Sequence, residues 1–168
     1  PRKRIALKLL VDCSGSMGGD SIASARVALH GALAGLTEHD QVSVSRFGST
    51  VEHVLAPSAS TPQTLRRLKP AVDAIDATLG GTEMEAALRA VFALPVPRDC
   101  AGADVLLVTD GEIWQAEEMT AAACASGHRV FAIGVGSSPA EGVLRALAEA
   151  TGGACEFATP GEALEAAA

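Results

Sequence analysis

The stretch Ile5–Ser16, IALKLLVDCSGS, decides the fold of this chain. Residues 5–11 are nearly continuous in apolar character, which is typical of a buried central strand in a parallel sheet. Residues 12–16 form a short turn that is rich in oxygen-bearing side chains and glycine. The same design recurs later, where the apolar run Ala103–Thr109 is followed by Asp110. The two stretches therefore predict two buried strands that each end in polar residues.

Apolar periodicity and turn residues divide the rest of the chain into alternating helices and strands. The helices are expected at Ser21–Leu36, Pro62–Ile75, Thr82–Leu94, from the Asp110-Gly111 turn to about Ser126, at Pro139–Ala150 and after Pro160. Pro70 is expected to kink or end the second of them. Four further strands are expected at Gln41–Phe47, Thr50–Ala56, His128–Val135 and Cys155–Ala158. The first two of these strands read as a hairpin joined through Gly48-Ser49. The order predicts an α/β fold, a doubly wound, mostly parallel six-stranded sheet with one antiparallel edge strand and helices on both faces.

Length and composition bound the class of protein. The chain has 168 residues, 48% of them apolar and 20% charged, which is the mix of one globular domain over residues 1–168. Both ends read as cut edges of a longer protein. The net charge of −7 and the 3% aromatic content disfavour binding to nucleic acid or to an anionic membrane. No apolar run reaches the roughly 18 residues that a membrane span needs.

The four cysteines argue for a reducing compartment. Cys13, Cys100, Cys124 and Cys155 form no CxxC pair, so neither zinc spacing nor a disulfide framework is present. The simplest interpretation is that the thiols are buried or have no chemical role. We therefore expect a cytoplasmic protein.

Polar side chains gather where the predicted strands end. Because function collects at the carboxyl ends of parallel strands, the turns after the first and fourth strands and the Gly80-Gly81-Thr82 segment are expected to converge. Their oxygen-bearing side chains are Asp12, Ser14, Ser16, Thr82 and Asp110. The first three are spaced by two, so they face one way in an extended segment, and Cys13 faces the other way. Hydroxyls and carboxylates without nitrogen or sulfur favour Mg²⁺, Mn²⁺ or Ca²⁺ over zinc.

Two interpretations compete with a ligand-binding metal site. Turn and helix-capping chemistry explains a lone Asp-x-Ser-Gly-Ser motif, but not its combination with Thr82 and Asp110. A metal-dependent hydrolase needs an acid or base beside the ion. His39 and His128 precede strands and fall at the opposite edge of the sheet, and no lysine maps to the site. Two carboxylates would balance a divalent ion and leave it open to an anionic oxygen from outside, so we predict a binding protein that is not an enzyme.

The three polar segments together resemble a known family. The motif Asp12-x-Ser14-Gly15-Ser16, the threonine of Gly80-Gly81-Thr82, and Thr109-Asp110-Gly111 are similar to the metal-ion-dependent adhesion site (MIDAS) of the von Willebrand factor type A (VWA) domain. The resemblance covers essentially the whole chain and implies a Rossmann-like fold with a divalent cation at the top of the sheet. Gly80-Gly81-Thr82-Glu83 and Asp110-Gly111-Glu112 are most similar to bacterial and inter-alpha-trypsin-inhibitor-heavy-chain-like branches of the family.

The resemblance also implies a function. In the family the serines and the threonine ligate the ion directly or by exchange, the aspartates often act through water, and the ligand is typically an Asp or Glu of a partner protein. We therefore expect a metal-dependent protein-interaction module that uses Mg²⁺, or Mn²⁺ or Ca²⁺. A subunit that couples to a MoxR-like or chelatase-like ATPase, as some relatives do, is the alternative, and a metal-dependent hydrolase ranks below both.

Overall fold

The computed structural model describes residues 5–80, 83–97, 100, 103–110, 116–135 and 141–157. Six strands in this part of the chain form one sheet with the order β3-β2-β1-β4-β5-β6. Their bounds are β1 Ala6–Asp12, β2 Gln41–Phe47, β3 Val51–Ala59, β4 Ala103–Thr109, β5 Arg129–Gly134 and β6 Cys155–Phe157. The β2–β3 pair at one edge is antiparallel, and the other neighbouring pairs are parallel. The predicted mostly parallel sheet with an antiparallel edge strand is confirmed.

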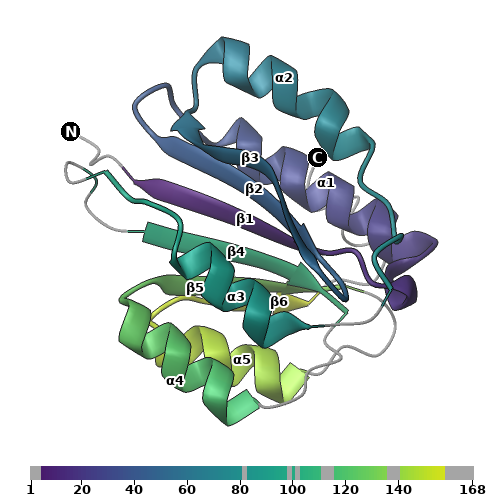
Figure 1. Ribbon diagram of the computed structural model, residues 1–168, viewed down its shortest axis with the longest axis vertical. Coiled ribbons are helices and arrows are strands. Elements are labelled where there is room, and N and C mark those ends of the chain that lie inside the picture. The colour runs from purple at the N-terminus through teal and green to yellow at the C-terminus, as the bar shows by residue number, and fades with distance from the viewer. Residues whose placement is uncertain are drawn as a thin grey trace.

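Helices cover both faces of the sheet. Their bounds are α1 Asp20–Ala34, α2 Pro62–Asp73, α3 Met84–Phe92, α4 Ala116–Ser126 and α5 Glu141–Ala150, and a short 3₁₀ helix, η1, spans Gly15–Met17. Figure 1 shows α1 and α2 on one side of the sheet and α3, α4 and α5 on the other. No helix in the described part of the chain is long and apolar enough to cross a membrane.

The central strand β1 is apolar throughout because helices cover it on both sides. Leu9 and Val11 are fully buried in the cluster that α1 and α2 close. Leu10, which points the opposite way, is fully buried in the cluster under α3, α4 and α5. A strand buried on both faces has no solvent side, so it lacks the polar alternation of an edge strand.

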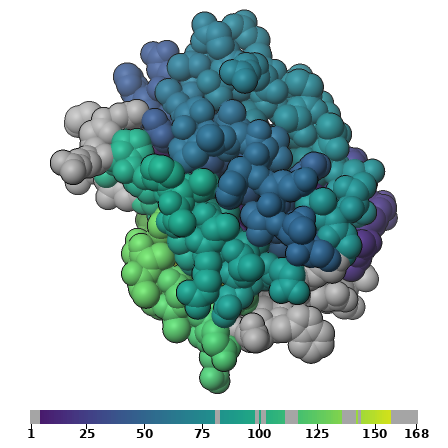
Figure 2. Space-filling view, in the orientation of Figure 1, coloured from purple at the N-terminus to yellow at the C-terminus, as the bar shows by residue number. Residues whose placement is uncertain are grey.

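The hairpin at the sheet edge differs from its partners. Strand β3 exposes several of its residues, including Glu52 and His53, and begins and ends later than the expected Thr50–Ala56. Figure 2 shows the surface of β3, in blue, between α2 and α3. Shifts in the β2–β3 register around Val44 accompany the irregular edge.

Helix α2 decides against one of the two effects expected of Pro70, a kink or an end of the helix. It continues past Pro70 to Asp73, so Pro70 does not end it, and the amide of Ala74 still donates to the Pro70 carbonyl at 3.0 Å. Leu68 and Val72 are both buried in the core on either side of the proline. This packing holds the last turn in spite of the amide hydrogen bond that proline removes. The helix expected after Pro160 lies outside the described residues.

The strand order places the candidate site. Strands β1 and β4 are parallel neighbours, with Val11 opposite Val108. In Figure 1 both strands run from left to right, so their carboxyl ends lie at the same edge of the sheet.

Candidate metal centre

Asp12 joins the ends of the two central strands. It is the last residue of β1 and is fully buried. Its Oδ1 accepts a hydrogen bond from the amide of Ser14 at 2.9 Å, and its Oδ2 accepts one from the Thr109 hydroxyl at 2.7 Å. Thr109, the last residue of β4, is fully buried as well. One carboxylate is thus fixed from both the β1 and the β4 side.

The two serines of the first turn lie together as the spacing predicts. Ser14 Oγ and Ser16 Oγ are 3.1 Å apart. Ser14 is 1% exposed, whereas Ser16 lies on the solvent side in η1. The pair therefore offers two neighbouring hydroxyl oxygens, one on a buried residue and one on an exposed residue.

Asp110 follows Thr109 and places a second carboxylate near the first. Burial raises the pKa of Asp12, hydrogen bonds from Ser14 and Thr109 lower it, and the charge of Asp110 raises it. A buried carboxylate whose charge is penalised by burial and by a nearby carboxylate is stabilised by a cation beside it. The residues present thus fit a divalent cation on electrostatic grounds.

Thr82, the remaining predicted ligand, lies outside the described residues, as do Glu112 and Trp114. The residues before Thr82 are tied to the first turn. The amide of Leu79 donates to the Cys13 carbonyl at 3.0 Å, and the amide of Gly15 donates to the Gly80 carbonyl at 2.8 Å. The structure thus brings the segment that precedes Thr82 to the serine turn.

Sulfur takes no part in the site. Cys13 is fully buried in the core on the α1 side, and burial raises the pKa of its thiol to about 12. A thiol held protonated is a poor metal ligand, so Cys13 does not supply the soft donor that zinc prefers. Met17, which borders the turn, is also fully buried, so it packs in the core and does not face a partner. Within the described ranges, no three His, Cys, Asp or Glu side chains gather as a metal-binding group.

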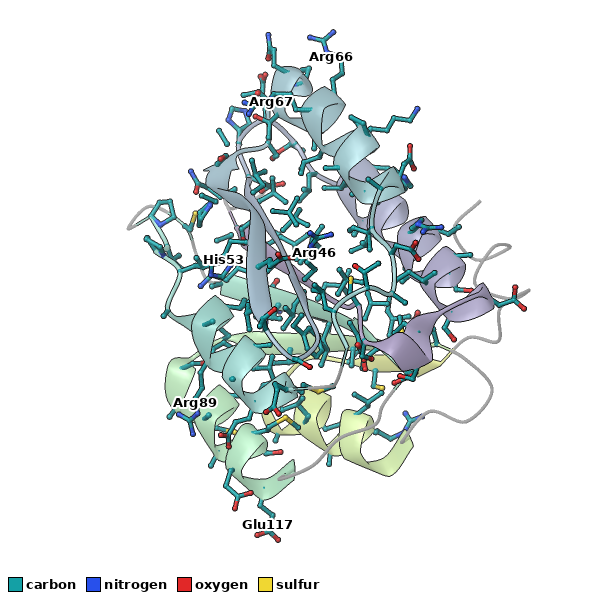
Figure 3. The ribbon with its side chains drawn as sticks, turned by 45° about the vertical axis from the view of Figure 1, so that its right-hand side comes forward. Arg46, His53, Arg66, Arg67, Arg89 and Glu117 are labelled. Atoms are coloured by element: carbon teal, nitrogen blue, oxygen red, sulfur yellow. The ribbon has the colours of Figure 1, made fainter. Side chains whose placement is uncertain are left out.

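Two arginines of α2 lie far from the serine turn. Figure 3 shows Arg66 and Arg67 at the end of α2 that is far from the turn between β1 and α1. Arg46, on the hairpin, donates to Glu52 at 2.7 Å. The guanidinium of Arg46 is therefore paired within the hairpin.

Sequence reasoning missed one participant at this edge. The sequence predicts only a hairpin connection between β2 and β3. In the structure, Gly48 and Ser49 of this turn contact Leu79 and Gly80. The glycine in the turn was the only sequence signal, and it does not say which distant segment needs the space.

Comparison with known proteins defines the class. The sequence model of the von Willebrand factor type A domain matches residues 5–157. A von Willebrand factor A domain-containing protein of Dictyostelium discoideum is 33% identical over 155 residues, which cover 88% of this chain and 16% of that protein. The human protein mono-ADP-ribosyltransferase PARP4 is 30% identical over 154 residues, which cover 89% of this chain and 9% of that protein. The chain belongs to the VWA domain family, and it spans a small part of these relatives.

Solved structures agree on the fold. A von Willebrand factor type A structure from Catenulispora acidiphila has a TM-score of 0.81 at 23% identity and covers 98% of this chain and 41% of that one. Proximal thread matrix protein 1 of the mussel byssus, in a structure with a zinc-occupied MIDAS motif, has a TM-score of 0.80 at 16% identity. That match covers 98% of this chain and 44% of the mussel protein.

Proposed function

We propose that this domain is a non-enzymatic, metal-dependent protein-interaction module. A divalent cation held by Asp12, Ser14, Ser16, Thr82 and Asp110 would bind an acidic side chain of a partner protein. The observation that carries the proposal is the shared carboxylate of Asp12, which accepts hydrogen bonds from the β1 turn and from β4 beside the Ser14–Ser16 hydroxyl pair.

The donor set supports a hard cation, and we propose Mg²⁺. Carboxylate and hydroxyl oxygens suit Mg²⁺, Mn²⁺ or Ca²⁺, and Mg²⁺ keeps water on positions that the protein does not fill. A partner carboxylate could replace such a water. The zinc in the MIDAS motif of the mussel protein supports a divalent ion at the corresponding site, and zinc therefore belongs among the ions to be tested.

The placement of the bases supports binding over catalysis. His39 lies just before β2, and His128 lies directly before β5. Both therefore lie at the sheet edge opposite to the site. An activated water would need an acid or base within hydrogen-bond reach of the metal. None of the four cysteines forms a disulfide bond with another, and we propose a cytoplasmic setting on that basis.

The test compares two serine substitutions. Ser14→Ala combined with Ser16→Ala should weaken binding of Mg²⁺ and Mn²⁺ by at least about tenfold in calorimetry, because it removes two of the three proposed hydroxyl ligands. Ser43→Ala is the matched control, since the Ser43 hydroxyl is buried without a hydrogen-bond partner and lies away from the site on β2. Both variants should keep a cooperative unfolding transition.

The partner is tested by chelation. A pull-down with the domain should retain a protein in Mg²⁺ and release it in EDTA, and a Glu→Gln or Asp→Asn change in that protein should act like EDTA. Retention at full strength in EDTA would place the partner on another face. Absence of divalent binding by the folded parent domain would end the metal proposal.

A further inference from the structure

The turn between β2 and β3 contacts the segment that leads to the third predicted ligand. The amide of Ser49 donates to the Leu79 carbonyl at 2.7 Å, and the amide of Glu83 donates to the Gly48 carbonyl at 2.8 Å. These two hydrogen bonds hold residues on both sides of Thr82 in the sequence. The turn supplies backbone groups to both of these hydrogen bonds.

The contact is close enough to exclude any side chain at Gly48. A Cβ atom at this position would lie 2.4 Å from the Leu79 carbonyl oxygen and 2.6 Å from the Leu79 Cβ. Gly80 has a φ of +78°, and a Cβ there would lie 2.9 Å from the Ser49 Oγ. The two segments therefore pack backbone against backbone, and Gly48 can be replaced only if Leu79 moves.

The same segment continues into the serine turn. The amide of Cys13 donates to the Phe47 carbonyl at 2.7 Å, and the Cys13 carbonyl accepts from the amide of Leu79 at 3.0 Å. With the bond between Ser49 and Leu79, the three segments form a closed ring of backbone hydrogen bonds. Gly15, which lies between the two serines, is tied to the ring through the Gly80 carbonyl.

We propose that the Gly48–Ser49 turn is a positioning element of the metal centre. It fixes Leu79 and Gly80, and through the Gly80 carbonyl it fixes the turn that carries the Ser14 and Ser16 hydroxyls. The inference rests on the proposed function, because it concerns how well the same site binds its cation.

Two glycine substitutions test the inference against matched controls. Gly48→Ala is paired with Gly35→Ala, where the added Cβ would be 3.6 Å from its nearest neighbour at the end of α1. Gly80→Ala is paired with Gly127→Ala, which has a similar φ of +74° and nothing within 4 Å of the added Cβ. The second pair imposes the same kind of backbone strain at opposite edges of the sheet, so strain alone should affect both variants alike.

The readouts are Mn²⁺ affinity by calorimetry, unfolding in urea, and amide hydrogen exchange at Gly15. Gly48→Ala and Gly80→Ala should bind Mn²⁺ about 10- to 100-fold more weakly than the parent and should exchange the Gly15 amide faster. Gly35→Ala and Gly127→Ala should match the parent in both measurements, although Gly127→Ala should unfold at a lower urea concentration.

The outcomes separate the two proposals. A parent domain that binds no Mn²⁺ overturns the proposed function and this inference with it. A parent that binds, together with folded Gly48→Ala and Gly80→Ala variants that bind equally well, overturns the inference alone. If Gly48→Ala does not fold, the comparison of Gly80→Ala with Gly127→Ala decides, because neither adds a contact with backbone atoms under 3 Å.

Discussion

At the scale of single residues, Lys8 is the largest departure from the apolar pattern of β1. It is 2% exposed, and its Nζ donates to the carbonyls of Val91 at 2.9 Å and Leu94 at 2.8 Å, at the carboxyl end of α3. Its Nζ also lies 3.4 Å from the Phe92 carbonyl oxygen and 2.9 Å from the Nε2 of His128. Since Nε2 accepts this hydrogen bond, the proton of the neutral ring is on Nδ1, which donates to the Ser126 carbonyl at 3.2 Å. The ammonium group therefore requires a neutral histidine.

This arrangement predicts a loss of stability in mild acid. Burial lowers the pKa of His128, the Lys8 charge lowers it further, and the Ser126 carbonyl and Asp104 raise it by less. The unfolded chain therefore binds the proton first as the pH falls below the ordinary histidine pKa of about 6.5. The stability that the neutral His128 contributes is complete above that pH. Below it, the unfolding free energy should decline by up to about 1.4 kcal/mol per pH unit.

Urea unfolding of the parent and of His128→Gln between pH 5 and 7.5 measures this contribution. The parent should lose more stability than the variant as the pH falls, and His39→Gln should behave like the parent. Equal slopes for the parent and His128→Gln would contradict the role assigned to the Lys8–His128 hydrogen bond.

At the scale of elements, periodicity predicted the strands and most of the helices because their burial follows local spacing. It failed where distant residues decide. Pro70 signals a helix end in sequence, but the burial of Leu68 and Val72 continues the helix past it. Lys8 lies in an apolar strand because carbonyls more than 80 residues away and His128 receive its protons. No pattern within one element contains that information.

A second close backbone contact, at Gly153, gives a prediction about the β5–β6 edge. A Cβ at Gly153 would lie 2.0 Å from the Val130 carbonyl oxygen and 2.6 Å from its carbon. Gly153→Ala should therefore force α5 and β6 away from β5 and lower the unfolding free energy by about 3 kcal/mol. Urea titration measures the loss, and Gly35→Ala, which adds an ordinary contact, should stay within about 0.5 kcal/mol of the parent. A Gly153→Ala variant as stable as the parent would show that the edge can separate at no cost.

At the scale of the whole molecule, the order of strands determines which turns meet at one edge of the sheet. Asp12, Ser14 and Ser16 are brought beside Thr109 and Asp110 as the neighbouring β1 and β4 require. The ring that joins this turn to Leu79 and Ser49 could not be predicted, because backbone hydrogen bonds between loops leave no residue-type signature.

The position of the site on loops above a complete core also determines what the cation does for stability. The core clusters lie on the two faces of the sheet and consist of apolar side chains from strands and helices. The domain should therefore fold without metal. Cation binding should raise the unfolding free energy only by the linkage term, which arises because the folded state binds the cation and the unfolded state does not. At a free Mg²⁺ or Mn²⁺ concentration of 100 times the dissociation constant, this term is about 2.7 kcal/mol.

For a chain of this size, that free energy corresponds to a rise in Tm of roughly 5–10 °C. At the same free cation concentration, thermal unfolding should show the rise in the parent and in Ser43→Ala, and a clearly smaller rise in the Ser14→Ala/Ser16→Ala variant. In EDTA the three proteins should unfold cooperatively at similar temperatures, since none of the removed hydroxyls supports the core. A parent that is unfolded in EDTA would mean that the cation is part of the folding core, and the separation of binding site from scaffold would be wrong.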